Sequence, residues 1–256
     1  MDKTDQTPLL IVTITEQRSG SKWFGSLIRD ATGASCIGEA FLPSSESIIS
    51  FERFAAQIGL VELNRMGIAE ALDRYFGDLS TYLGRLLHCD LMFNQREWLS
   101  FGWTSAGVAI YEYLKSRDAI VISLLRDEKS VFLSQKALPL IGQAHFFDDE
   151  EPKIPPSREV AALSAEEYQH FCEVLKRNRT CLTDAMVGYE RFIEVRYDDI
   201  CRTGELPPSL IKLVSSAAAE RGLPVDSRGR VTTARSPRPS RIDYSALFSN
   251  ADRLMG

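Results

Sequence analysis

Short runs of apolar residues alternate along the chain with segments in which apolar residues recur every three or four positions. The runs 9–14 and 119–125 contain no charged residue and include several β-branched side chains, which is typical of parallel strands buried on both faces. Weaker patterns predict further strands at 34–41, 91–94 and 192–197. Because the strands alternate with helical patterns, the chain is expected to be an α/β protein with a central parallel sheet flanked by helices.

Helical spacing is most extensive at 48–88, which we interpret as a mainly helical subregion. Its aromatic series, including Tyr75, Phe76 and Tyr82, is expected to be core rather than a ligand site. A capping box at Ser164–Glu167 predicts a helix that runs to about residue 187. Further helices are predicted after residue 20, at 104–115, 131–138 and 207–221.

The composition is that of an ordinary soluble globular protein, because 44% of the 256 residues are hydrophobic and 25% are charged. This length fits one domain, 1–256. No apolar run approaches the roughly 20 residues that span a bilayer, and the first residues do not have the pattern of a signal peptide. The five cysteines are scattered without a CxxC pair, which predicts reduced thiols and a cytoplasmic protein. The net charge of −5 argues against general affinity for nucleic acid.

A polar turn at 15–21 follows the first predicted strand and precedes a helix. A strand, turn and helix in this order aim the unpaired N–H groups of the helix start at an anion. Arg18 and Lys22 add two positive charges at this point, and Ser19 and Ser21 add two hydroxyls. The pattern indicates a phosphate or sulfate site, although the same residues also suit an ordinary loop that faces water.

The turn is neither a Walker A loop nor a GxGxxG dinucleotide fingerprint. Its sequence, Arg-Ser-Gly-Ser-Lys-Trp at 18–23, instead resembles the 5′-phosphosulfate loop of sulfotransferases that use 3′-phosphoadenosine 5′-phosphosulfate (PAPS). The resemblance implies the P-loop-kinase-like fold of that family and a PAPS donor. The residues that it assigns to this cofactor are Arg18, Ser19, Gly20, Ser21, Lys22 and Trp23.

A second anion site is predicted at the end of the strand 119–125. Arg126 follows that strand, and Ser134 comes eight residues later on the next predicted helix. A guanidinium at the carboxyl end of a strand can clamp a phosphate while a hydroxyl completes the cage. The spacing resembles the 3′-phosphate site of the same sulfotransferases. In the alternative interpretation, Arg126 pairs with Asp127 or Glu128 at the surface and Ser134 is incidental.

The segment Gly38–Phe41 resembles a Gly-x-x-Glu-x-Phe segment of bacterial carbohydrate sulfotransferases, of the trehalose and nodulation-factor type, which implies that Glu39 is the general base. Loop carboxylates are also common as solvated surface groups. The strand 91–94 resembles the central strand of the family, but Asp90 stands where the family has Lys. His88 is the alternative base; its position is two residues out of step with that role, which favours a packing or surface histidine.

Two polar loops have open interpretations. The acidic, proline-containing segment 143–156 either covers the acceptor site or is a solvated insertion. The segment 227–241 carries five arginines and no acid. By resemblance to the basic C-terminal loop of sulfotransferases, Arg235 and Arg238 are expected to contact the nucleotide, whereas a disordered Ser/Arg-rich tail has the same composition. The segment 244–250 resembles the closing helix of the same family, which implies a helix there.

The resemblance therefore predicts an enzyme that moves a sulfuryl group from PAPS to a hydroxyl of a carbohydrate or glycolipid, with 48–88 on the acceptor side. Glu39 would accept the proton of that hydroxyl, while Arg18 and Lys22 stabilise charge on the leaving oxygen. No metal is expected, and the partner is a small-molecule or glycan acceptor. Two other classes stay open: a P-loop-like nucleotide-dependent kinase, and a non-catalytic nucleotide-binding module, which Asp90 favours.

Overall fold

The computed structural model describes residues 7–42, 47, 49–95, 106–141, 162–225 and 242–251. These residues form a five-stranded sheet in the order β2-β3-β1-β4-β5, and each strand is parallel to its neighbours. The strands are β1 (Leu9–Thr15), β2 (Ser35–Gly38), β3 (Leu86–Met92), β4 (Ile120–Leu125) and β5 (Phe192–Arg196). The predicted α/β fold with a central parallel sheet flanked by helices is confirmed.

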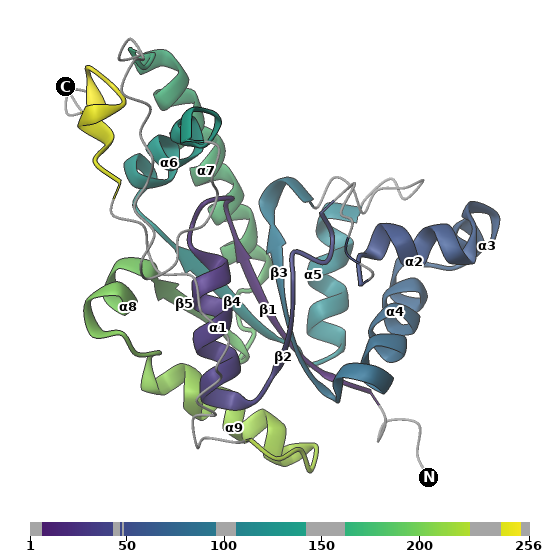
Figure 1. Ribbon diagram of the computed structural model, residues 1–256. Helices are drawn as coiled ribbons and strands as arrows, with labels where there is room; N and C mark the ends of the chain where they lie inside the picture. Colours follow the sequence, from purple (N-terminus) through teal and green to yellow (C-terminus); the bar gives the residue numbers. More distant parts are fainter. Residues whose placement is uncertain are drawn as a thin grey trace.

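Helices cover both faces of this sheet (Figure 1). They are α1 (Ser21–Thr32), α2 (Phe51–Ile58), α3 (Leu60–Arg65), α4 (Ile68–Leu83), α5 (Ala106–Ser116), α6 (Glu128–Ile141), α7 (Ala165–Ala185), α8 (Tyr197–Thr203) and α9 (Pro208–Glu220). Apolar residues of α1, α8 and α9 pack on one face, and those of α2, α4, α5 and α7 pack on the other. Helix α6 forms a third cluster with α7 and the segment 242–251.

β1 is the central strand and is buried along its whole length. Leu10 and Val12 belong to the cluster under α4 and α5, whereas Leu9 and Ile11 belong to the cluster under α1. Successive side chains of a strand point to opposite faces, so a strand covered on both faces is mostly apolar on both. This arrangement explains why β1 gives such a continuous apolar run in the sequence.

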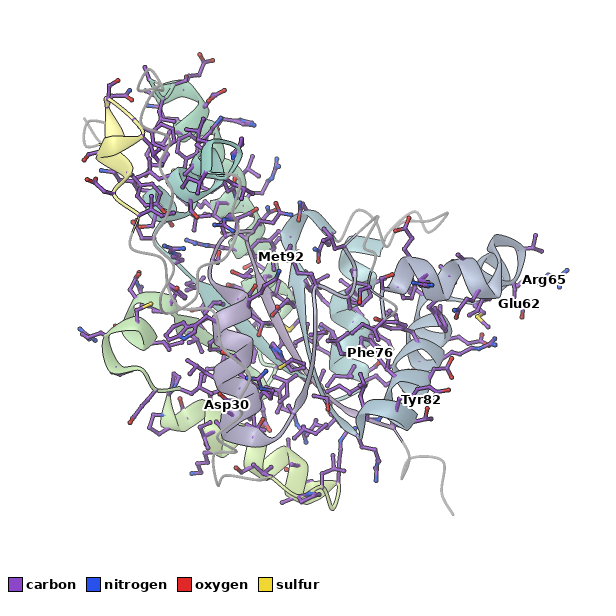
Figure 2. All side chains as sticks on the ribbon, in the orientation of Figure 1. Asp30, Glu62, Arg65, Phe76, Tyr82 and Met92 are labelled. Carbon is purple, nitrogen blue, oxygen red and sulfur yellow. The ribbon has the colours of Figure 1, made fainter. Side chains whose placement is uncertain are left out.

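The helical subregion buries most of its predicted aromatic series. Tyr75 and Phe76 are each 2% exposed, and Figure 2 shows Phe76 inside the molecule. Tyr82, in the last turn of α4, is 87% exposed and lies at the edge of the same view. The prediction that Tyr82 belongs to the core is therefore wrong; its neighbours Leu79 and Leu83 are the residues at this end of α4 that pack against the core.

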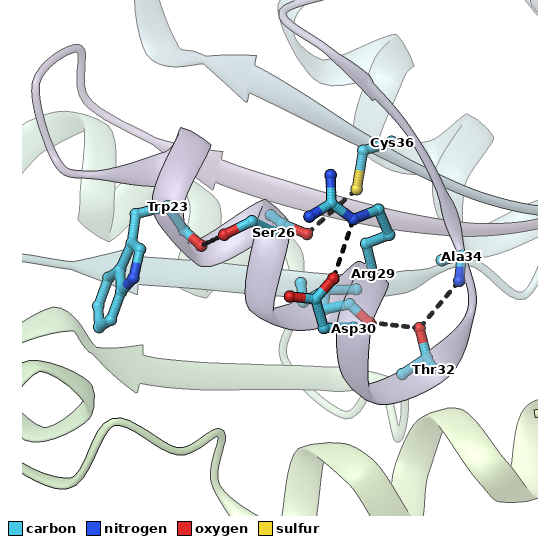
Figure 3. Close-up of polar contacts among 9 residues, drawn as sticks. Trp23, Ser26, Arg29, Asp30, Thr32, Ala34 and Cys36 are labelled. Atoms are coloured by element: carbon cyan, nitrogen blue, oxygen red, sulfur yellow. Dashed lines mark hydrogen bonds and ion pairs between the residues drawn. The ribbon is translucent and has the colours of Figure 1, made fainter. Parts of the chain in front are cut away.

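Helix α1 ends at the predicted glycine stop. Gly33 has a φ of 74°, and its N–H donates to the carbonyl of Arg29, as expected of a left-handed C-cap. The Thr32 hydroxyl donates to the carbonyl of Ile28 at 2.6 Å and accepts from the N–H of Ala34 at 3.2 Å, so the chain turns at once into β2 (Figure 3). These contacts fix where α1 ends relative to the sheet.

β3 begins earlier than the sequence pattern predicts. A strand confined to 91–94 is wrong, because α4 ends and β3 begins before residue 88. His88 and Asp90 are strand residues, opposite Ile11 and Thr13 of β1. Both are buried, with 0% and 1% exposure, so their polar side chains interrupt the apolar run that would have marked the strand.

The predicted closing helix at 244–250 is also wrong. Only a 3₁₀ turn, Tyr244–Ala246, is present there. Leu247 and Phe248 follow it and pack against apolar residues of α6 and α7. The segment is thus positioned by side-chain burial rather than by a continuous helix.

Two predicted loops lie outside the described residues: the acidic loop 143–156, and the basic loop 227–241 with Arg235 and Arg238. The extent of a single domain over 1–256 stays a prediction. Among the helices that the structure describes, none combines the length and the apolar character needed to cross a bilayer.

Candidate active site

The carboxyl ends of the parallel strands meet at one edge of the sheet, which is where open α/β sheets bind ligands. β1 connects through α1 to β2 on one side, whereas β4 connects through α6 and α7 to β5 on the other side. The point at which the connections change direction lies between β1 and β4 (Figure 1). Residues 16–20 follow β1 and Arg126 follows β4, so the topology brings both predicted anion sites to this point.

The β1–α1 loop has an unusual backbone that tertiary contacts hold in place. Arg18 and Gly20 have φ angles of 70° and 86°, in the left-handed region that favours glycine. The ring of Tyr197 is so close to Gly20 that a Cβ added there would lie 2.1 Å from a ring carbon. Trp23 packs edge-on against the same ring, with the centroids 5.6 Å apart. Position 20 therefore requires glycine, both because of its φ angle and because the Tyr197 ring leaves no space for a Cβ.

The first turn of α1 presents hydrogen-bond donors at this loop. Gly20 is its N-cap and provides no capping side chain, and no acidic residue lies in the turn. Ser19 is 1% exposed, and its Oγ has no hydrogen-bond partner among the described residues. A buried hydroxyl without a partner costs stability unless a ligand completes its hydrogen bonds. Together with the positive helix start, this feature indicates an anion site.

Arg126 joins the two predicted sites directly. Its Nη1 donates to the main-chain carbonyl of Arg18 at 2.7 Å, and its guanidinium lies over the ring of Tyr197, 4.8 Å from the centroid. Its Nε is buried and has no hydrogen-bond partner among the described residues. The alternative of a surface ion pair is not observed, since Glu128 pairs with Arg179 and Asp127 accepts from the N–H of Ser130.

Ser134 and Gln135 of α6 form hydrogen bonds with the β1–α1 loop. The Nε of Arg18 donates to the buried Oγ of Ser134 at 3.2 Å, and Nε2 of Gln135 donates to the carbonyl of Gln17 at 3.2 Å. Burial lowers the pKa of the Arg18 guanidinium, Tyr244 opposes this change, and the charge of Arg126 adds to it. Arginine keeps its charge under such shifts. Two like charges are thus held close together, an arrangement that an anion would stabilise.

Arg179 of α7 holds the loop that carries Arg126. Its Nη2 donates to the carbonyl of Arg126 at 2.7 Å, and its Nη1 forms an ion pair with Glu128, the first residue of α6. One guanidinium therefore fixes both the residue that follows β4 and the start of α6. The sequence offers no sign of this role, because Arg179 lies on a different helix, 53 positions away from Arg126.

Glu39 and Gln95 meet beyond the ends of the neighbouring strands β2 and β3. The Nε2 of Gln95 donates to Oε2 of Glu39 at 3.0 Å, and Oε1 of Gln95 accepts from the N–H of Met92 at 3.1 Å. Glu39 also interacts electrostatically with Arg18. The predicted base therefore lies at the same edge of the sheet as the two predicted anion sites.

A buried polar cluster lies beneath the start of α1. The ring of His88 is hydrogen-bonded through Nε2 to Oγ1 of Thr13 at 2.8 Å, and Nε2 lies 3.7 Å from Oδ1 of Asp90. Burial lowers the pKa of His88 to about 3. Burial, with the charge of Glu39, raises the pKa of Asp90 to about 7, against the opposing effects of Lys22 and of a hydrogen bond from Ser21. His88 is thus a packing histidine rather than a surface one.

The structure brings most of the predicted residues together. Arg18, Arg126 and Ser134 form one network, while Lys22 is exposed on the first turn of α1. Sequence reasoning assigned no role to Arg179 and treated Gln95 and Tyr197 only as parts of strand patterns. Their partners lie far away in sequence, so no local spacing could have revealed the contacts.

No family model and no curated protein matches the chain. Among solved structures, the chain is similar to the crystal structure of mouse sulfotransferase SULT7A1 complexed with PAP. The superposition has a TM-score of 0.39 and 11% sequence identity, and it covers 87% of this chain. The chain spans 62% of the length of the mouse protein's chain.

Proposed function

We propose that the protein is a PAPS-dependent sulfotransferase. The observation that carries the proposal is that two of the five buried polar atoms without a partner in the described structure, Ser19 Oγ and Arg126 Nε, are donors at the two predicted anion sites. They belong to loops that touch each other, at the point of the sheet where ligands of α/β proteins bind. A ligand with two separate anionic groups would complete both sets of hydrogen bonds, and PAPS has that chemistry.

In the proposed complex, the donor lies along the β1–α1 loop. Ser19, Ser21 and the N–H groups of the first turn of α1 would hold the 5′-phosphosulfate, because this turn has no acid or side-chain cap of its own. Arg126 and the hydroxyl of Ser134 would hold the 3′-phosphate. Trp23, beside the Tyr197 ring, is assigned to the nucleotide by resemblance only; so are Arg235 and Arg238.

The proposed reaction is an in-line transfer. The acceptor oxygen attacks sulfur and gives its proton to the carboxylate of Glu39, while the bond between sulfur and the bridging phosphate oxygen breaks. 3′-Phosphoadenosine 5′-phosphate (PAP) leaves with the electron pair of that bond. Arg18 and Lys22 would stabilise the negative charge that develops on this oxygen.

The acceptor that we propose is a hydroxyl of a carbohydrate or glycolipid, and the setting is the cytoplasm. This part of the proposal rests on the resemblance of the segment Gly38–Phe41 to bacterial carbohydrate sulfotransferases. It is supported by the position of Glu39 at the carboxyl edge of the sheet, where Gln95 holds its side chain.

Calorimetric titration with PAP tests the donor site, with adenosine 5′-monophosphate as the control that lacks the 3′-phosphate. We expect PAP to bind and the monophosphate to bind at least about tenfold more weakly, since a charged hydrogen-bonded contact is lost. Equal affinity for the two nucleotides, or no binding of PAP, would contradict the proposal. Transfer of radiolabelled sulfate from PAPS to trehalose and to chitin oligosaccharides then tests the acceptor class.

A magnesium-dependent phosphoryl transferase is the second candidate, favoured by one contact. The hydroxyl of Ser21 bonds to Asp90, and a helix-start hydroxyl with a strand carboxylate is the pair that holds Mg²⁺ in P-loop enzymes. The residues fit that role poorly, because Asp90 is only 1% exposed and Lys22 follows the serine instead of preceding it. Binding of ATP with Mg²⁺ in preference to PAP would favour this candidate.

A further inference from the structure

Gln95 has only one possible orientation at its site. It follows β3 directly in a short turn and is 1% exposed. The main-chain N–H of Met92 donates to its side chain at 3.1 Å, and only the carbonyl end of the amide can accept this bond. The amino end must therefore point the other way, toward Glu39, where it donates to Oε2 at 3.0 Å. The donor that faces Glu39 is thus set by the backbone of β3.

Glu39 is held from two sides. Its backbone lies in a tight turn in which the N–H of Ala40 bonds to the carbonyl of Gly38 at 2.9 Å and the N–H of Leu42 bonds to the carbonyl of Glu39 at 3.1 Å. Its side chain is held by Gln95. The hydrogen bond from Gln95 thus anchors the carboxylate through Oε2.

The chemical nature of the anchor matters for a base. An arginine or lysine at this position would neutralise the carboxylate and reduce its tendency to take a proton. A neutral amide donor fixes the orientation without supplying a full opposite charge.

We propose that Gln95 is a positioning residue that aims the Glu39 carboxylate at the acceptor hydroxyl. The inference rests on the proposed function, in which Glu39 is the base. Gln95 does not touch the reacting atoms; it acts through Glu39 alone. Its own position is set by β3, the strand next to β1, so the base is tied to the same sheet as the donor loop.

The substitution Gln95→Glu separates the two hydrogen bonds of this residue. A glutamate at 95 still accepts from the N–H of Met92, but it turns an oxygen toward Glu39, so that a donor is replaced by a like charge. The control is Gln57→Glu, which adds the same charge at an exposed position of α2. Crystal structures of the wild type and of both variants with PAP provide the first measurement. We expect the Glu39 side chain to leave its position only in Gln95→Glu.

Transfer of labelled sulfate to trehalose provides the second measurement. For Gln95→Glu we expect kcat to fall about 10- to 100-fold, as for a misplaced catalytic group, while the dissociation constant for PAP changes by less than about twofold. In the background of Glu39→Gln, the same substitution should lower kcat by no more than about twofold, because the base is already absent.

The outcomes separate the two proposals. Failure of the wild type to bind PAP overturns the proposed function. If the wild type binds PAP but Glu39 keeps its position in Gln95→Glu, the role of Gln95 is overturned, whichever acceptor the enzyme uses. An equal loss of PAP affinity and of kcat in Gln95→Glu also overturns it, since that result indicates general damage to the fold.

Discussion

The two sides of the β1–α1 loop carry opposite chemistry. On the side of β4 and α6, Arg18 and Arg126 are cations that are hydrogen-bonded to a hydroxyl and to a main-chain carbonyl. Beneath the start of α1, His88 and Asp90 are fully buried. Burial lowers the pKa of His88 and raises that of Asp90, so that each group favours its neutral form. The half-buried arginines keep their positive charge, whereas the fully buried groups inside the sheet favour their neutral forms, because burial of an unpaired charge is costly.

Substitutions in the two regions are also expected to affect different properties, ligand affinity in one and stability in the other. The arginine side has donors whose hydrogen bonds the described protein does not complete, so changes there should mainly affect anion affinity. The His88 and Asp90 side also has buried atoms without a partner among the described residues, His88 Nδ1 and Asp90 Oδ1, but both residues lie inside β3 with at most 1% exposure and bond to Thr13 and Ser21 of the same fold. Changes there should mainly affect stability and its pH dependence.

The largest effect is expected for Arg126→Ala. In the proposed complex Arg126 holds the 3′-phosphate of PAP, so without this guanidinium the affinity for PAP should fall by about 2–5 kcal/mol, as for loss of one partner of a buried charge contact. Calorimetric titration measures the change. The control is Arg202→Ala, since Arg202 is 77% exposed and only pairs with Asp199 on the same helix; an equal loss in both variants would contradict a specific site.

Gly20→Ala should cause the next largest loss. Its Cβ would collide with the ring of Tyr197, and the left-handed φ of 86° is strained for alanine. The free energy of unfolding should decrease by about 2–4 kcal/mol in urea denaturation. Gly77→Ala is the matched control, because a Cβ meets nothing within 4 Å there and the helix interior favours alanine by about 0.5–1 kcal/mol. Loss of stability in both variants would refute the steric argument.

Asp90 and His88 are expected to make the stability of the fold depend on pH in opposite directions. The raised pKa of Asp90, about 7 against an ordinary 3.8, makes its contribution to stability fall as the pH rises between these values. The lowered pKa of His88, about 3 against 6.5, makes its contribution fall as the pH drops through that window. In Asp90→Asn, stability should therefore rise more steeply with pH between about 4 and 6.5 than in the wild type, by up to about 1.4 kcal/mol per pH unit.

The reciprocal variant sharpens this test. In His88→Gln, stability should fall more steeply with rising pH over the same window, because the contribution of Asp90 is no longer opposed. Denaturant titrations at several pH values measure both slopes. If the two variants change the slope in the same direction, the assignment of neutral forms to the pair is wrong.

The smallest effect is expected for Arg179→Ala. This residue contacts the carbonyl of Arg126 and the side chain of Glu128, so its loss should loosen the 3′-phosphate site without removing a phosphate ligand. The affinity for PAP should decrease by about 1 kcal/mol, the net value of an ordinary hydrogen bond. The affinity for adenosine 5′-monophosphate should not change; an equal decrease for both nucleotides would show that the effect is not confined to the 3′-phosphate.

Much of the fold could be read from the sequence because buried parallel strands leave a local signal. β1 and β4 are continuous apolar runs that end at the loop and at Arg126, and Gly33 marks the end of α1. β3 could not be read in the same way, since His88 and Asp90 interrupt its apolar pattern. Those two residues are tolerated in a buried strand only because Thr13 and Ser21, from other elements, bond to them.

The sequence by itself determined which residues of this protein carry charge and hydroxyls, and that they follow strands of a parallel sheet. Only the tertiary structure decided that Arg126 contacts the loop of Arg18, that Tyr197 covers Gly20, and that Gln95 reaches Glu39. Strand and helix patterns depend on neighbouring residues, whereas these contacts depend on strand order and helix packing. They join residues that the chain itself keeps far apart.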